Sequence, residues 1–194
     1  MKFTIFKKKN ILPALLLSIS LTCASPMDAI KKNDIELQSL IKRNQSAASQ
    51  ENVDRMKFLI NDIFDFEEMG RRALGSSTWK SQDIAKQAEF VAAFKAMVEN
   101  ASVKKLEVYQ SDKTVYEEAD FSGKKQTLTA HVWAKGEESI LAYKFKNNDG
   151  NWKAWDLVIN DLSTMRNYRE QFKDILKDKS FDELVKILKD KAAE

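Results

Sequence analysis

Histidine and cysteine, which carry much of protein chemistry, each occur once in this sequence, as His131 and Cys23. A single histidine excludes a multi-histidine metal site, and Cys23 lies in an N-terminal apolar segment, so no Cys–His pair forms. The five glycines are isolated, and no phosphate-binding loop, dinucleotide fingerprint or G-x-S-x-G nucleophile motif is present. We therefore expect no metal and no cofactor, although carboxylates could still do acid–base work.

The N-terminal segment is typical of a secretory signal peptide. Lys2 and residues 7–9 give a basic start, residues 11–21 form an apolar run, and residues 22–24 offer small side chains for cleavage. The run is too short for an ordinary transmembrane helix. We predict a cleavable signal at residues 1–24, a single mature domain at residues 25–194, and a periplasmic location.

Two outcomes are possible for Cys23, which lies at the predicted cleavage site. It is removed with the signal, or it is lipidated, although residues 20–22 (Ser-Leu-Thr) fit a lipidation box poorly. In both cases the mature chain has no disulfide and depends on an apolar core. A domain of about 170 residues buries roughly 70% of its unfolded surface, which is sufficient.

The charge of the whole chain is dominated by the same segment. The chain has 32 basic and 29 acidic residues, and residues 1–24 hold four lysines and no acid, which leaves 28 against 29. A mature net charge of −1 does not indicate a nucleic-acid binder.

Apolar periodicity predicts helices at both ends of the domain and strands between them. The helices are expected at residues 27–44, 53–74, 81–105, 163–178 and 180–190, and the strands at residues 114–118, 127–135, 139–146 and 152–160. Ser81, Ser163 and Ser180 are expected helix caps, and Gly75 a helix stop. Residues 148–150 (Asn-Asp-Gly) predict a tight hairpin.

The last strand is apolar on both faces, which is typical of a covered strand, so we expect it at the centre of the sheet. Its alternation places Trp155, Leu157 and Ile159 on one side. The fold class predicted is α+β, with helices on one face of a small twisted antiparallel sheet of about four strands.

Two aspartates, Asp65 and Asp156, are flanked by apolar residues. A buried carboxylate in an apolar cone would be a candidate general base; alternatively, each bonds a backbone amide or an arginine and fixes local geometry. His131 is expected at the surface or hydrogen-bonded. Arg166 and Arg169 lie three residues apart, where they could meet a lipid phosphate or pair with acids of the chain.

The chain resembles the MlaC, or toluene-tolerance, family over residues 35–190. The first half of the resemblance is carried by residues 64–69, Leu74-Gly75, Trp79 and the Phe90–Phe94 helix. The more specific half is carried by Trp152-Lys153, residues 156–159, Leu162-Ser163, residues 167–169 and Gln171-Phe172. The chain departs from the family pattern at Asp161, at Thr164 and around Lys179-Ser180.

The resemblance implies a fold similar to the nuclear-transport-factor-like cone, with acyl chains in an apolar cavity. It implies a periplasmic phospholipid carrier, expected to be a monomer, with no catalysis and no nucleic-acid partner. The carrier would shuttle lipid between an inner-membrane transporter with lipid-binding MCE subunits and an outer-membrane lipoprotein–porin complex.

We expect the apolar side chains of this cone to line the lipid site. They are Phe66, Met69, Phe90, Phe94, Met97, Val132, Leu141, Tyr143, Phe145, Trp155, Leu157, Ile159 and Phe172. Arg166 and Arg169 are candidate head-group or partner contacts. Two alternatives remain at this point, a cone-fold enzyme of the isomerase or dehydratase type using Asp65 or Asp156, and a periplasmic lipoprotein-binding chaperone with an open apolar groove.

Overall fold

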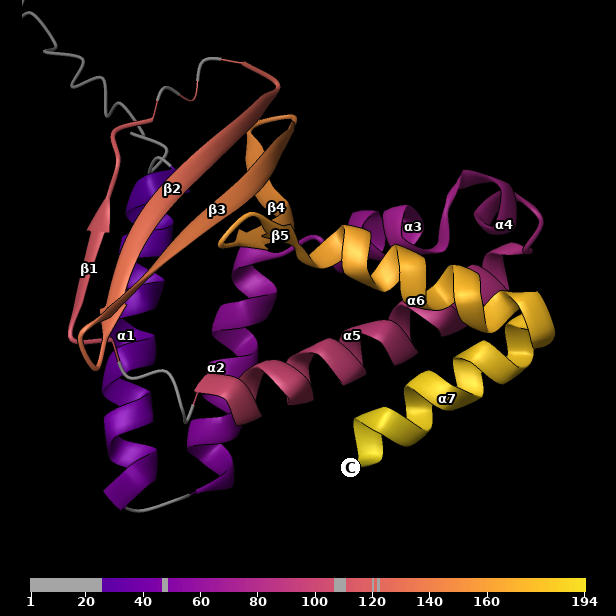
Figure 1. Ribbon diagram of the computed structural model, residues 1–194, viewed down its shortest axis with the longest axis horizontal. Helices are drawn as coiled ribbons and strands as arrows, with labels where there is room; N and C mark the ends of the chain where they lie inside the picture. The colour runs from indigo at the N-terminus through magenta and orange to yellow at the C-terminus, as the bar shows by residue number, and fades with distance from the viewer. Residues whose placement is uncertain (1–25, 47–48, 107–110, 120, 122) are drawn as a thin grey trace, which may run out of the picture.

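The computed structural model describes residues 26–46, 49–106, 111–119, 121 and 123–194. The signal peptide predicted at residues 1–24, with Cys23, lies outside these residues. Helices form a layer beside and behind one antiparallel sheet (Figure 1). The helices are α1 Pro26–Ser46, α2 Gln50–Ile63, α3 Phe66–Leu74, α4 Ser76–Lys80, α5 Ile84–Leu106, α6 Thr164–Asp178 and α7 Phe181–Ala193. None of the helices in this part of the chain is long and apolar enough to cross a membrane.

The sheet has five strands in the order of the chain, each antiparallel to the next. They are β1 Lys113–Tyr116, β2 Lys125–Ala134, β3 Glu137–Asn148, β4 Asn151–Ile159 and β5 Leu162–Ser163. The α+β class is confirmed. The expectation that residues 152–160 form the central strand is wrong, because β3 is central and β4 is bordered by the two-residue β5.

Two tight turns set the register of the central hairpins. Lys135 and Gly136 join β2 to β3 with φ of 53° and 83°, and Asp149 and Gly150 join β3 to β4 with φ of 51° and 91°. Two consecutive positive φ values give the type I′ turn that matches strand twist. The hairpin predicted at residues 148–150 is confirmed.

A β-bulge interrupts β4. Lys144 pairs with Asp156 and Phe145 pairs with Ala154, which leaves Trp155 without a partner on β3. A bulge shifts the alternation of side chains by one position. The expectation that Trp155 shares a side with Leu157 and Ile159 is therefore wrong; Trp155 instead lies near Lys144, whose Nζ is 5.7 Å from the indole ring.

The helix boundaries follow from the caps. Ser163 accepts from the Arg166 amide, Ser180 and Glu183 form a capping box, and Gly75 ends α3 at φ 86°. These three predictions are confirmed. At α5 the capping prediction is wrong, because Asp83, not Ser81, accepts from the Lys86 amide at 2.8 Å.

Two apolar clusters hold the layers together. The larger joins the helices around Phe90, Phe94 and Phe172, whose rings lie 5.8 to 6.0 Å apart. The smaller joins the sheet to α1 and the end of α2, with Ile30 against Leu128, Phe145 and Ala154. The helical layer and the sheet are thus packed mainly within themselves and meet along a narrow seam.

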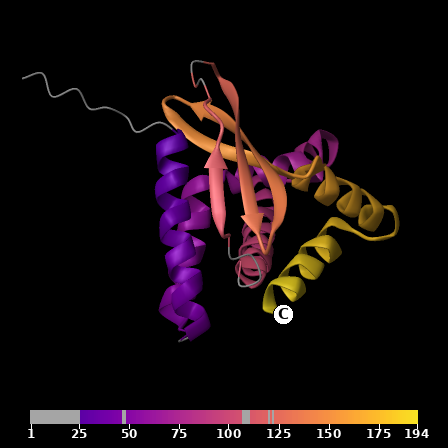
Figure 2. The same ribbon diagram turned by 60° about the vertical axis from the view of Figure 1, so that its left-hand side comes forward.

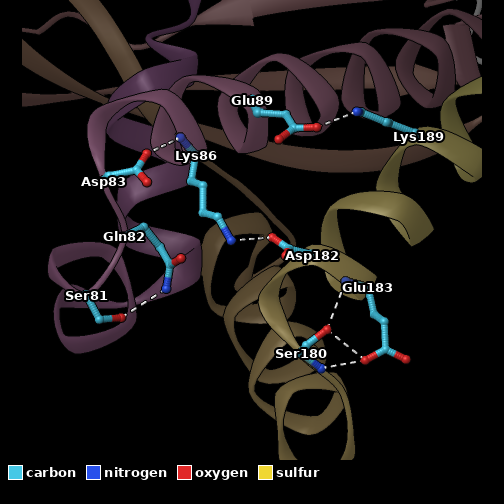
Figure 3. Close-up of polar contacts among 9 residues, drawn as sticks. All are labelled: Ser81, Gln82, Asp83, Lys86, Glu89, Ser180, Asp182, Glu183 and Lys189. Atoms are coloured by element: carbon cyan, nitrogen blue, oxygen red, sulfur yellow. Dashed lines mark hydrogen bonds and ion pairs between the residues drawn. The ribbon is translucent and has the colours of Figure 1, made fainter.

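Helix α7 is fastened to α5 by apolar packing and by two ion pairs (Figure 3). Lys86 lies 2.8 Å from Asp182, and Lys189 lies 2.6 Å from Glu89. Beneath these pairs Leu184, Val185 and Leu188 are buried. The lysines of α6 and α7 alternate with acids and are exposed, as is typical of a solvated helix face.

Candidate functional site

One face of the sheet is turned toward α1 and α2 (Figures 1 and 2). At the end near the β3–β4 turn this face is closed, because Leu128, Phe145 and Ala154 pack against Ile30. This end of the face therefore forms an ordinary core.

The other end of the same face lies outside both apolar clusters of the described residues. Directly paired residues share a face of a sheet, and the pairs Ala130–Leu141, Leu141–Ile159 and Tyr143–Leu157 bring Leu141, Leu157 and Ile159 onto it. Val132 follows Ala130 on the same side of β2. All four side chains are half-buried or exposed, and none belongs to either apolar cluster. We call Val132, Leu141, Leu157 and Ile159 the open apolar face.

The open apolar face continues to the edge of the sheet. Leu162 of β5 pairs with Ile159 and therefore lies on the same side. The exposed fraction of these residues rises toward the edge of the sheet, to 41% at Ile159 and 77% at Leu162. Apolar side chains thus continue from the sheet interior to its solvent-exposed edge.

A groove of about 850 Å³ opens between α1 and β1. Thr114 and Tyr116 line its sheet side, and Thr114 pairs with Val132, so the groove adjoins the open apolar face. Its helix side carries Ile35, which is 73% exposed. The volume lies within the range of ordinary ligand pockets.

The polar side chains of the groove are of both signs. Lys31 lies 5.7 Å from the ring centre of Tyr116, and Lys113 is on the opposite wall. Burial raises the pKa of Asp34, against hydrogen bonds from Tyr116, Gln38 and Thr114. The pKa of Tyr116 is raised as well, first by burial and then by the Asp34 charge. Apolar groups such as Ile35 beside Lys31 and Lys113 could accommodate an amphiphile that carries an anionic head.

The predicted lining residues divide into two groups. The members on helices lie inside the packed helical cluster and are Phe66, Met69, Phe90, Phe94, Met97 and Phe172. The members on strands are Val132, Leu141, Tyr143, Phe145, Trp155, Leu157 and Ile159. Only the four residues of the open apolar face are brought together outside a packed cluster. Contact with lipid remains a prediction for all of them.

The groove residues of α1 and β1 are absent from the sequence-based set. Ile35 lies off the buried stripe formed by Ile30, Leu37, Leu40 and Ile41. An apolar residue outside the buried stripe of its helix was the one feature of the sequence that could have indicated the groove. Nothing in the local pattern marks Asp34 or Tyr116, because their proximity depends on how α1 crosses the sheet.

The predicted contacts Arg166 and Arg169 differ in their surroundings from two arginines of α3. Arg166 and Arg169 are exposed on α6, and neither makes an ion pair with any residue that the structure describes. Arg71 and Arg72 both pair with the buried Glu68, at 2.8 and 2.7 Å, and these arginines lower the Glu68 pKa despite its burial.

The two candidate general bases have structural partners. Asp65 caps α3 by accepting from the Glu68 amide at 2.9 Å. Asp156 is buried and accepts from the Met165 amide at 3.0 Å and from the Ser163 hydroxyl at 2.8 Å. These bonds match the alternative in which each aspartate fixes local geometry.

His131 is held between two carboxylates on the face of the sheet away from α1. Its Nε2 lies 3.0 Å from Glu117 and its Nδ1 2.7 Å from Glu138. The expected hydrogen-bonded histidine is confirmed. Within the described ranges no group of three or more histidine, cysteine or carboxylate side chains is arranged to hold a metal ion.

Comparison with known proteins identifies the family. The sequence matches the MlaC protein family over residues 31–190. The chain belongs to the MlaC family. The resemblance read from residues 64–69 and 152–172 is thereby confirmed. No curated protein matches the chain.

The fold is shared with a solved structure. A phospholipid-binding protein from Ralstonia solanacearum, solved in complex with a phospholipid, superposes with a TM-score of 0.74. The two sequences are 20% identical, and the match covers 88% of this chain and 98% of the other. At this identity the likeness shows a shared MlaC-type fold. Family and fold together indicate phospholipid binding or transport.

Proposed function

We propose that the protein carries phospholipid through the periplasm between the inner and outer membranes, as the soluble component of an Mla-type transport system. The observation that carries the proposal is the open apolar face, in a chain of the MlaC family. An inner-membrane transporter with MCE subunits and an outer-membrane lipoprotein–porin complex are the proposed partners.

The energetics of lipid transfer explain why a carrier needs such a face. Burying one methylene contributes about 0.8 kcal/mol. Two acyl chains with about 30 methylenes would therefore cost on the order of 20 kcal/mol to expose to water. The carrier has to cover the chains, whereas the head group can stay hydrated. Selectivity is then expected to depend on chain volume more than on the head group.

The proposal is tested by native mass spectrometry of protein purified from a periplasmic extract, followed by lipid extraction. We expect a stoichiometric adduct of phospholipid mass. Leu141→Trp and Leu157→Trp should lower the bound lipid, because each fills space above the open apolar face. Ile140→Trp is the matched control, since Ile140 is on the same strand but faces the other side.

The chaperone alternative is kept open by the groove between α1 and β1, which is exposed to solvent along one side. A lipoprotein-binding protein would hold an acylated peptide there. Extraction distinguishes the two, because acylated peptide and phospholipid differ in mass. Failure of both native and added phospholipid to bind would contradict the carrier proposal.

A further inference from the structure

A row of lysines crosses the face of the sheet that is turned away from α1. Lys125, Lys146 and Lys153 occupy directly opposed positions on β2, β3 and β4. Like charges opposite one another on neighbouring strands repel and destabilise a sheet. This arrangement is unfavourable in the isolated protein and becomes favourable when an anion lies over it.

The chain itself neutralises only part of this charge. With Lys144, which lies on the same face of β3 as Lys146, the row forms a cluster of four lysines, which we call the lysine patch. Lys144 lies 3.3 Å from Asp156 and Lys153 lies 3.5 Å from Asp62. No ion pair within the described part of the chain involves the other two, Lys125 and Lys146. The patch thus keeps a local excess of positive charge although the mature chain has almost none.

A hollow of about 280 Å³ lies within the lysine patch. Lys125, Thr127, Lys144 and Trp155 contribute to its walls. The indole Nε1–H of Trp155 is buried and has no acceptor among the described residues. The Arg72 guanidinium lies 3.9 Å from the same ring. The patch therefore combines cations, a hydroxyl and an amphipathic ring around a small depression.

The composition of the patch favours a lipid surface over a protein surface. Lysine is depleted at protein–protein interfaces. Clusters of four to eight cations are typical of segments attracted to anionic lipid head groups, and tryptophan prefers the head-group level of a bilayer. No described helix passes in front of β2 and β3 on this side of the sheet (Figure 1).

We propose that the lysine patch docks the protein onto the head-group surface of a bilayer containing anionic phospholipid. Membrane docking would use one face of the sheet, and the cargo would use the other. The choice of a bilayer as partner rests on the proposed carrier function, since a lipid carrier has to exchange cargo with a lipid phase.

The test is co-sedimentation of the purified protein with phosphatidylglycerol vesicles and with phosphatidylcholine vesicles, at low and high salt. Binding is expected only to phosphatidylglycerol and only at low salt. The double variant Lys125→Gln/Lys146→Gln should bind about 25-fold more weakly, at about fivefold for each lysine. The control Lys173→Gln/Lys186→Gln removes the same charge from exposed sites on α6 and α7 and should bind as the unmodified protein does.

Three outcomes would overturn the docking proposal. They are no binding to phosphatidylglycerol vesicles, an equal loss in both double variants, and binding of polyglutamate through the patch without vesicle binding, which would assign the patch to an acidic protein. Native mass spectrometry of the same samples separates this result from the carrier function. Bound phospholipid without vesicle binding contradicts docking alone, and vesicle binding without bound phospholipid contradicts the carrier alone.

Discussion

Asp156 joins the sheet to helix α6 through a single buried side chain. Its carboxylate accepts from the Met165 amide in the first turn of α6 and from the Ser163 hydroxyl, and it lies 3.3 Å from Lys144 Nζ. Ser163 in turn caps the same helix. The direction in which α6 leaves the sheet is therefore set at this residue.

Replacing Asp156 by alanine should destabilise the protein by about 3 kcal/mol, because buried donors lose their acceptor and Lys144 loses its counter-charge. Urea unfolding followed by circular dichroism measures the change. Asp190→Ala, at an exposed position of α7, is the control and should change stability by less than about 0.5 kcal/mol. Equal effects of the two substitutions would contradict the role of Asp156.

His131 gives the protein one pH-dependent contact on the face of the sheet away from α1. Hydrogen bonds to Glu117 and then Glu138 raise the His131 pKa above its ordinary value of 6.5. A raised pKa in the folded state means that this contact stabilises fully below pH 6.5. The contribution is lost as the pH rises through the folded pKa.

Because His131 is the only histidine, its imidazole signals in a proton NMR titration need no assignment. We expect a pKa above 6.5, which Glu117→Gln should shift downward because the first of the two hydrogen-bond partners is then uncharged. Glu67→Gln, at an exposed carboxylate of α3, should leave the titration unchanged. A His131 pKa insensitive to Glu117→Gln would show that the contact is absent in solution.

At the scale of elements, α7 depends on its first turn. Ser180 accepts from the Glu183 amide, and Glu183 accepts from the Ser180 amide at 2.8 Å (Figure 3). Ser180→Ala should lower the free energy of unfolding by about 1 kcal/mol, since the helix loses its cap. Ser180→Thr keeps a capping hydroxyl and should recover most of the loss. Thermal unfolding of the two variants makes the comparison, and equal losses would exclude the capping role.

The elements with local signals could be predicted from the sequence. Ser163, Ser180 and the Asp149-Gly150 turn act through neighbours within three or four residues, so their effect is visible in the sequence. The bulge at Trp155 could not be predicted, because it is defined by the pairing of β4 with β3 and no local residue requires it. Strand order also depends on pairing between distant residues, which is why the prediction that β4 is the central strand was wrong.

The candidate site was predicted less well than the fold, for a related reason. Apolar periodicity identifies residues that avoid water. It does not distinguish Phe94, which lies in a packed core, from Leu141, which lies on the open apolar face. Only the three-dimensional packing separates the two. The groove residues Asp34 and Tyr116 are brought together by the crossing of α1 and β1, which no sequence spacing encodes.

At the scale of the whole molecule, the helices form a packed apolar cluster, whereas the open apolar face belongs to neither cluster of the described residues. Its side chains are only half-buried or exposed among the residues that the structure describes. Burying this face under acyl chains would add contacts between the sheet and the helices beside the narrow seam formed by Ile30 and Phe64. Cargo would then contribute to the stability of the protein as well as being transported.

Removing the lipid should consequently lower the melting temperature. A ligand at about 100 times its Kd adds about 2.7 kcal/mol, which for a domain of this size corresponds to about 5–10 °C. Scanning calorimetry of loaded and delipidated protein measures the difference. The difference should shrink in Leu157→Trp, whose indole occupies the lipid space, and persist in Ile140→Trp on the other face. A melting temperature independent of lipid would mean that the open apolar face stays uncovered when lipid is bound.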